Sequence, residues 1–155
     1  MKKKFVDPNI ENKSKTVEEK IQLIKFNGKM LPLPTEIEIS ESGTCNRTCS
    51  FCPRSAKDFV DKKEFISNFL HQKLCNELER LKYKGTIRYS GFVEPLIDKN
   101  IYNLINMTKT HLPQSNIELV TNGDPLNLKR LNKLFENGLN KILISAYDDE
   151  ENNIL

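Results

Sequence analysis

The sequence predicts an α/β fold in which four parallel strands form a sheet and helices cover its outer face. Two observations support this prediction. Strand-like and helix-like segments alternate along most of the 155 residues, and two of the helical segments are followed by Gly85 and Gly138, a common way for a helix to end. This order of elements implies right-handed crossovers and a parallel sheet. Such sheets carry their chemistry at the carboxyl ends of the strands.

The individual elements follow from the spacing of apolar residues. Residues 35–40 read Thr-Glu-Ile-Glu-Ile-Ser, which is the alternation of a strand. In the last helix, Asp124 is the expected N-cap and Pro125 the expected first helical residue. The predicted strands cover residues 35–40, 86–90, 117–121 and 141–145, and the predicted helices cover 65–83, 99–111 and the segment between Asp124 and Gly138.

Residues 1–34 differ from the rest because they are polar and rich in lysine. Within them, residues 17–26 have helical spacing, and Gly28 with the run Leu-Pro-Leu-Pro at 31–34 prevents the helix from continuing. We therefore expect residues 1–34 to form an N-terminal extension packed outside the main fold, and residues 35–155 to form the core domain.

The composition excludes several functional classes. The chain is 37% hydrophobic and 29% charged, with a formal net charge of only +3. Positive and negative residues are interspersed, so no nucleic-acid surface is predicted. No apolar run follows the N-terminal lysines, so neither a secretion signal nor a membrane span is expected. Three of the four cysteines lie within eight residues, which predicts a metal site in a reducing, cytoplasmic setting rather than disulfides.

Cys45, Cys49 and Cys52 form the motif C-x3-C-x2-C directly after the first predicted strand. Three thiolates this close can bind three irons of a cubane cluster. No fourth ligand is near in sequence, so one iron would be open to a substrate or cofactor, as in catalytic metal sites. The alternative is a closed zinc or iron–sulfur site with Cys75 as its fourth ligand. Cys75 falls in the middle of a predicted helix beside the apolar stripe, where a small buried thiol is common, so the open cluster is favoured.

This motif, with the aromatic Phe51 before its last cysteine, resembles that of the radical S-adenosylmethionine superfamily, and the resemblance extends from residue 35 to about residue 149. It implies a partial (β/α) barrel of the radical SAM type. It also implies a [4Fe–4S] cluster whose fourth iron binds the amino and carboxylate groups of S-adenosylmethionine. Family barrels normally have six βα units, and about four are present. We therefore expect an incomplete core with strands in the order 1-2-3-4 and an open side beyond the fourth, from a fragment or a truncated reading frame.

The same resemblance assigns residues to the S-adenosylmethionine site. The segment Ser-Gly-Phe-Val-Glu-Pro at 90–95 looks like the family's Gly-Gly-Glu-Pro element, although Phe92 and Val93 replace its two glycines. Its carboxylate is expected to contact the methionyl ammonium. Residues 121–123 resemble the family's Thr-Asn-Gly turn, and Ser145 resembles a polar position facing the ribose or methionine. The cofactor-contacting residues implied in this way are Phe51, Ser90, Gly91, Glu94, Thr121, Asn122 and Ser145.

Strand alternation makes a separate prediction about the interior of the barrel. Apolar residues are expected to face the helices, and polar residues the interior. Because ordinary barrel interiors are apolar, a polar one predicts a wet cavity that holds a ligand. The outward set is Ile37, Ile39, Ile87, Tyr89, Ile142 and Ile144, and the inward set is Glu36, Glu38, Ser40, Arg88, Ser90 and Ser145.

Three further side chains have less specific interpretations. His71 and His111 are lone histidines in helical segments, and surface or helix-end positions are expected for them. Arg54 follows the cysteine motif, where it could either meet an anionic substrate or remain a surface cation.

The function implied by the resemblance is that of a radical SAM oxidoreductase, which generates a 5′-deoxyadenosyl radical for hydrogen abstraction. The implied partners are a peptide, sugar or small-metabolite substrate and a reductant such as a flavodoxin or ferredoxin. One alternative is a non-catalytic relative that binds a cluster for structure or partner contact. Another is an electron-transfer module, which usually needs a fourth cysteine ligand.

Overall fold

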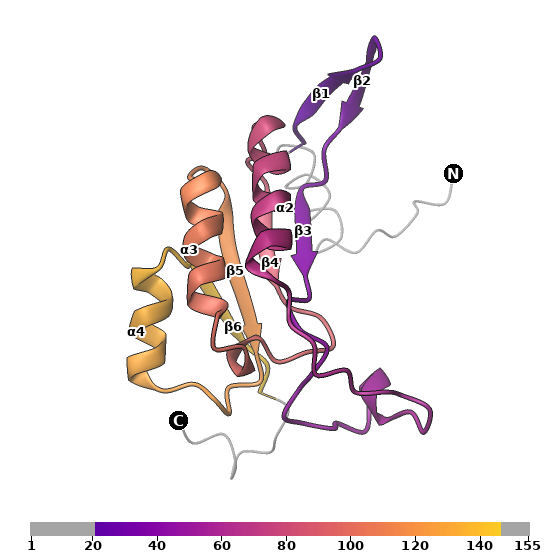
Figure 1. Ribbon diagram of the computed structural model, residues 1–155, viewed down its shortest axis with the longest axis vertical. Helices are drawn as coiled ribbons and strands as arrows, with labels where there is room; N and C mark the ends of the chain where they lie inside the picture. The colour runs from indigo at the N-terminus through magenta and orange to yellow at the C-terminus, as the bar shows by residue number, and fades with distance from the viewer. Residues whose placement is uncertain (1–20, 147–155) are drawn as a thin grey trace, which may run out of the picture.

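The computed structural model of the chain describes residues 21–146. Its main sheet has four parallel strands in the order β3-β4-β5-β6, and the helices lie on one face of this sheet (Figure 1). The predicted α/β class, the parallel sheet and the strand order are therefore confirmed. The strands are β3 (Glu36–Ile39), β4 (Thr86–Tyr89), β5 (Asn116–Thr121) and β6 (Lys141–Ile144); the helices are α2 (Asn68–Arg80), α3 (Ile101–His111) and α4 (Leu128–Glu136), with the 3-10 turns η1 (Pro53–Ser55) and η2 (Pro95–Ile97).

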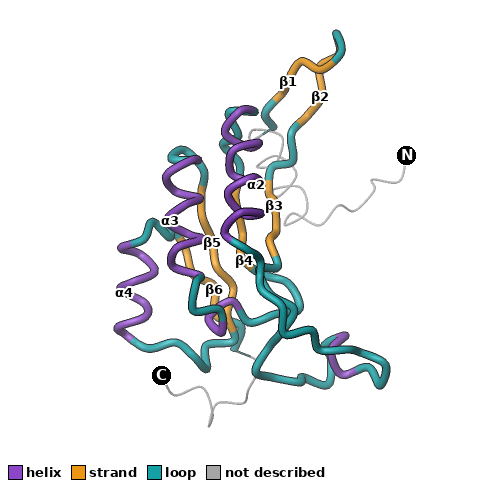
Figure 2. The backbone as a smooth tube through the Cα atoms, in the orientation of Figure 1, coloured by secondary structure: helices purple, strands orange, loops and turns teal. Residues whose placement is uncertain are grey.

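A β-hairpin precedes the main sheet and corrects the prediction of a helix over residues 17–26. Strand β1 (Leu23–Phe26) pairs with β2 (Lys29–Pro32) in a separate antiparallel sheet, which projects from one end of the molecule (Figure 2). Asn27 and Gly28 form the turn with positive φ angles of 46° and 77°. An Asn-Gly pair is a strong signal for a two-residue hairpin turn, and the helical spacing around it was misleading. Residues 17–20 of that predicted helix lie outside the described residues.

The helices begin later than predicted because other residues cap them. Ser67 is the N-cap of α2, and its hydroxyl accepts a hydrogen bond from the Leu70 backbone at 3.2 Å. The prediction that Asp124 is the N-cap of α4 is wrong. Asn127 is the cap, and its side chain accepts a hydrogen bond from the backbone of Arg130 at 2.9 Å. A side-chain oxygen at this position satisfies a backbone N–H that has no partner within the helix.

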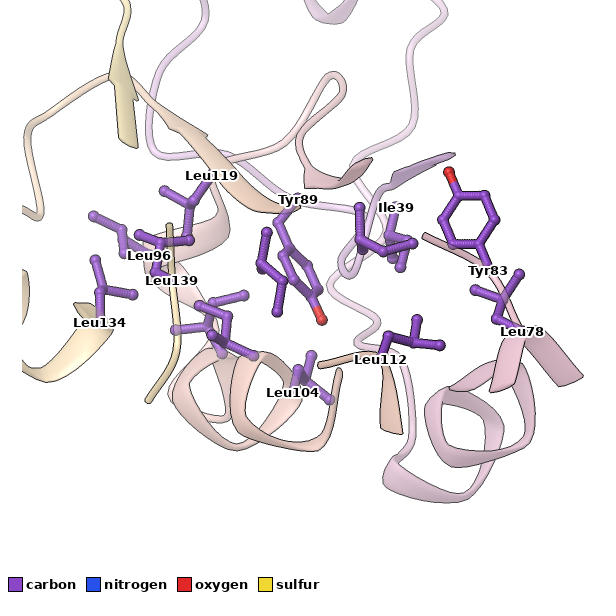
Figure 3. Packing of buried hydrophobic residues seen from close by; sticks show 14 of the residues in the cluster. Ile39, Leu78, Tyr83, Tyr89, Leu96, Leu104, Leu112, Leu119, Leu134 and Leu139 are labelled. Carbon is purple, nitrogen blue, oxygen red and sulfur yellow. The ribbon is translucent and has the colours of Figure 1, made fainter. Parts of the chain in front are cut away.

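The core lies between the sheet and the helices. Tyr89 and Leu119 from the strands and Leu104 from α3 have no exposed surface, and Figure 3 shows Tyr89 pointing from its strand toward the helices, beside Leu104. Burying each aliphatic side chain of this size contributes roughly 1.5–3 kcal/mol. The residues predicted to face the helices belong to this core or pack against it, with one exception. They are Ile37, Ile39, Ile87, Tyr89 and Ile142. The exception is Ile144, which is 41% exposed. Ile144 is the last residue of β6.

A polar network crosses the core and corrects the surface position predicted for His71. The His71 side chain is fully buried, and its Nε2 lies 2.9 Å from the Tyr89 hydroxyl. That hydroxyl lies 2.7 Å from Oγ1 of Thr108. Burial lowers the pKa of His71 to about 4, so the ring is neutral near neutral pH. His111, by contrast, ends α3 and lies 2.7 Å from a carboxylate oxygen of Glu79, as predicted for a helix-end histidine.

The opposite face of the sheet carries the polar residues predicted for the interior. Arg88 on β4 forms ion pairs with Glu36 on β3 and, at 2.8 Å, with Glu118 on β5. Lys141 on β6 lies 3.6 Å from Glu118. Charges of alternating sign therefore neutralise one another across four neighbouring strands.

Candidate functional site

A cavity of about 270 Å³ opens where the loops after the parallel strands meet. Figure 1 shows these loops gathered at the end of the sheet to which the strands point. Four segments contribute side chains: the cysteine loop, the loop after β4, the end of β5 and the residue after β6. All ten predicted site residues line this one cavity, namely Cys45, Cys49, Phe51, Cys52, Ser90, Gly91, Glu94, Thr121, Asn122 and Ser145.

The cysteine loop has a regular local structure around its last two cysteines. The Cys52 amide donates to the Cys49 carbonyl at 2.9 Å, and the Ser55 amide donates to the Cys52 carbonyl at 2.9 Å. Pro53 occupies the first position of η1, where its fixed φ favours the turn. Both Cys49 and Cys52 line the cavity. The three motif cysteines are free and partly exposed.

Arg54 joins the cysteine loop to the loop after β4, a role that neither sequence interpretation included. The residue is only 9% exposed, and its guanidinium donates to the carbonyls of Gly43 and Phe92 at 3.1 Å each. It also forms an ion pair with Asp61 at 2.8 Å and lies over the ring of Phe59. A guanidinium with these partners is a positioning group rather than a free surface cation.

Glu94 connects the loop after β4 with the end of β5. Its side chain is 1% exposed. One carboxylate oxygen accepts hydrogen bonds from the Thr121 hydroxyl at 2.7 Å and the Leu96 amide at 3.0 Å, and the other accepts one from the Asn122 amide at 2.8 Å. A carboxylate has about four acceptor positions, so these three hydrogen bonds leave about one unused.

Gly91 is required by close packing beside the cavity. Its φ of 118° lies in the region that L side chains rarely adopt, and a Cβ at this position would lie 2.1 Å from the hydroxyl oxygen of Ser40. That hydroxyl donates to the Ser90 carbonyl at 3.0 Å and so joins the ends of β3 and β4. Gly91 lies one residue before the positions of the two glycines in the family's Gly-Gly-Glu-Pro element. It therefore has a structural function of its own.

One contact beside the motifs was not predicted from the sequence, and it joins Asn46 and Arg47 to Asp124. The Arg47 guanidinium binds both carboxylate oxygens of Asp124, and Asn46 donates to one of them at 2.8 Å. The hydrogen bonds from Arg47 lower the pKa of the Asp124 carboxyl. Arg47 and Asp124 are 77 residues apart, and no local spacing pattern connects them.

The motif cysteines supply thiols, which as thiolates are the usual ligands of an iron–sulfur cluster. Within residues 21–146, no three His, Cys, Asp or Glu side chains stand close enough to bind one ion together. Three free, partly exposed cysteines line one cavity, and their thiol chemistry fits a cluster bound by thiolates.

Cys75 lies away from this cavity. It is 2% exposed on α2, and its sulfur lies 3.7 Å from Nδ1 of His71 and 3.8 Å from Oγ1 of Thr108. Burial raises the pKa of its thiol, which disfavours the thiolate that a metal needs. This geometry agrees with the small buried thiol expected from the sequence.

Glu41 carries a buried carboxyl group whose charge interacts with that of Glu94. Glu41 has no exposed surface, and burial, together with the charges of Asp98 and Glu94, raises its pKa to about 7. One of its carboxylate oxygens accepts a hydrogen bond from the Ser42 hydroxyl at 3.3 Å, whereas the other has no partner among the described residues.

Comparison with known proteins gives the family. The model of the radical SAM superfamily matches residues 39–152, which is well over half of the chain. The chain belongs to the radical SAM superfamily.

Two named proteins are similar to this chain over part of their own length. The chain is 33% identical over 111 residues to the S-adenosyl-L-methionine-dependent 2-deoxy-scyllo-inosamine dehydrogenase of Niallia circulans, a match that covers 72% of this chain and 44% of the dehydrogenase. It is 30% identical over 93 residues to the GTP 3′,8-cyclase of Mesorhizobium japonicum, which covers 58% of this chain and 28% of the cyclase. The chain therefore spans less than half the length of either relative.

Two solved structures share the fold. The crystal structure of BtrN in complex with AdoMet and 2-DOIA matches with a TM-score of 0.69 and 33% identity, over 72% of this chain and 45% of that one. BtrN in an open conformation matches with a TM-score of 0.67 and 33% identity, over 77% of this chain and 54% of that one.

No helix within residues 21–146 is long and apolar enough to cross a membrane.

The raised pKa of Glu41 predicts a specific pH dependence of stability. Its folded-state value of about 7 exceeds the ordinary value of 4.5. Between these values the folded chain holds a proton that the unfolded chain has released. The stabilisation is therefore fully present below pH 4.5 and is lost as the pH rises through 7. Glu41→Gln should make the chain more stable than the parent at pH 8, by about 1–3 kcal/mol, and change it little at pH 5.

Urea unfolding of the reduced chain at a series of pH values measures this effect. The exposed Glu136→Gln is the matched control and should follow the parent at every pH. An identical pH profile for the parent and Glu41→Gln would show that Glu41 does not titrate in this range.

Proposed function

We propose that this chain binds a [4Fe–4S] cluster through Cys45, Cys49 and Cys52 and binds S-adenosylmethionine in the same cavity. The observation that supports this most directly is the meeting of all ten predicted residues around one cavity at the carboxyl end of the sheet. Membership of the radical SAM superfamily supports the same pair of cofactors. A cluster held there would supply the electron that cleaves S-adenosylmethionine into methionine and a 5′-deoxyadenosyl radical, and this radical would abstract a hydrogen atom from the substrate.

The residues of the chain hold and orient the cofactors in this proposal. Glu94 presents a negative charge whose position is fixed by Thr121 and Asn122, and it accepts a hydrogen bond from the methionyl ammonium. Ser90 and Ser145 offer hydroxyl groups from two other strand ends. Such groups fix the orientation of the cofactor and so the direction in which the radical is released.

The side chain of Phe51 extends the apolar part of the site. Phe51 is 66% exposed and lines the cavity beside the cysteines, as Phe92 does at 59% exposure. Apolar groups around a cluster limit the access of solvent and influence its reduction potential. We assign Phe51 and Phe92 to this shielding role.

The proposed substrate is a small polar metabolite. The two relatives are named for small molecules, an inosamine and GTP, and these names favour a metabolite over a peptide. The name of the first relative favours an oxidation, for which S-adenosylmethionine would be the oxidant. The substrate would lose one hydrogen atom to the 5′-deoxyadenosyl radical, then one proton to solvent and one electron back to the cluster. A low-potential protein such as a flavodoxin or ferredoxin is the proposed electron donor, which is consistent with a reducing, cytoplasmic setting and four free cysteines.

The three motif cysteines should each be required for the cluster. After anaerobic reconstitution with iron and sulfide, Cys45→Ser, Cys49→Ser and Cys52→Ser should each lose the iron that the parent retains, because each thiolate binds a different iron. Cys75→Ser is the matched control and should retain it. Iron and acid-labile sulfide per chain, together with visible absorption, measure the outcome. Equal iron loss in Cys75→Ser would instead indicate a closed site with four cysteines.

Glu94 should contribute to cofactor affinity without contributing iron ligands. Glu94→Gln removes the negative charge that faces the methionyl ammonium. We expect S-adenosylmethionine to bind the reconstituted chain roughly ten- to hundredfold more weakly, at unchanged iron content. Anaerobic calorimetry compares this variant with Glu136→Gln, an exposed position outside the cavity. Equal affinity in both variants would assign Glu94 to loop structure alone.

A further inference from the structure

The loop that carries Cys45 is tied to the turn after β5 by contacts that the proposed function does not use. The carboxylate of Asp124 accepts hydrogen bonds from two nitrogens of the Arg47 guanidinium, one of them at 2.7 Å. The same carboxylate accepts a hydrogen bond from the Asn46 amide at 2.8 Å. Two consecutive residues after Cys45 are thus held by one carboxylate from the turn after β5.

Asn122 fixes the other side of this contact. Its Nδ2 donates to Oδ1 of Asn46 at 2.8 Å, and its own Oδ1 accepts a hydrogen bond from the Asp124 amide at 3.0 Å. Its backbone amide donates to Glu94 at 2.8 Å. The side chain is therefore held in one orientation, with its donor group directed toward the cysteine loop.

The sulfur of Cys45 is the atom that these contacts surround. It lies 3.4 Å from the Arg47 backbone nitrogen and 3.9 Å from Nδ2 of Asn122, and both groups donate toward it. Within residues 21–146, the sulfurs of Cys49 and Cys52 receive no comparable hydrogen bond. The Cys45 sulfur also lies 3.8 Å from Oδ1 of Asn46.

Hydrogen bonds to a ligand sulfur have a definite effect on an iron–sulfur cluster. An N–H donor stabilises negative charge on the sulfur, and the reduced cluster carries one more negative charge than the oxidised cluster. Donors of this kind therefore favour reduction and raise the reduction potential. Asn122 has its donor in this position with respect to Cys45.

We propose that Asn122, together with the contacts of Asp124 to Asn46 and Arg47, positions Cys45 and raises the reduction potential of the cluster. This inference rests on the proposed function, because it requires the cluster. It assigns Asn122 to the cysteine side of the cavity as a positioning residue, in addition to the cofactor contact that the family resemblance implies.

Redox titration of the reconstituted chain, followed by electron paramagnetic resonance, tests this inference. Asn122→Ala removes the donor without adding charge. At the midpoint potential of the parent, we expect the ratio of reduced to oxidised cluster to fall about tenfold, which corresponds to 59 mV for a one-electron couple. Asn122→Asp retains the shape but replaces the donor with a negative oxygen, so its ratio should fall further.

Asn127→Asp is the control for added charge. It introduces the same charge at the N-cap of α4, outside the cavity, where Asp and Asn cap equally well. Its reduced fraction should stay near that of the parent. Loss of the cluster from a folded Asn122→Ala chain would support the positioning role of Asn122.

An unchanged midpoint potential in both Asn122 variants, in a chain that assembles its cluster, would overturn this inference and leave the proposed function intact. Failure of the unaltered chain to assemble a cluster would overturn both.

Discussion

The arrangement of the site depends on one buried carboxylate. Glu94 accepts hydrogen bonds from Thr121 and Asn122 at the end of β5, while its backbone amide donates to the carbonyl of Thr44 beside the first motif cysteine. It therefore links three loops that are distant in sequence. A buried carboxylate is costly unless hydrogen bonds compensate it, and these bonds form only when the three loops are in place. The same interactions that keep Glu94 in the interior thus give the cavity its shape.

Much of this arrangement was predictable because it follows from local patterns. Two-residue alternation predicted the strands, and each predicted motif directly follows a strand. In a parallel sheet the carboxyl ends lie at one edge, so topology alone brings Cys45, Glu94, Asn122 and Ser145 to one cavity. The polar face of the sheet was predictable for the same reason, because Arg88 alternates with the buried Ile87 and Tyr89.

The features that escaped prediction depend on partners far away in sequence. Asp124 is a residue type that often caps helices, but its carboxylate binds Arg47. Asn127 caps the helix instead. His71 was predicted to lie at the surface because its sequence context shows no buried polar partner. That partner is the hydroxyl of Tyr89, which lies beside its ring. Arg54 had two possible roles from the sequence, and its guanidinium instead binds Phe92, 38 residues away, together with Gly43 and Asp61 in the connection between β3 and α2. The hairpin turn at residues 27–28 and the caps Ser67 and Asn127 had local signals that were overlooked.

The central claim is that the three motif cysteines leave one iron of the cluster open to S-adenosylmethionine. Electron paramagnetic resonance of the reduced, reconstituted chain tests this most directly, with and without S-adenosylmethionine. Our account predicts that the cofactor changes the spectrum of the cluster, because its amino and carboxylate groups become ligands of the open iron, and that Cys75→Ser shows the same change. A reduced cluster whose spectrum is unaffected by saturating S-adenosylmethionine would contradict the account.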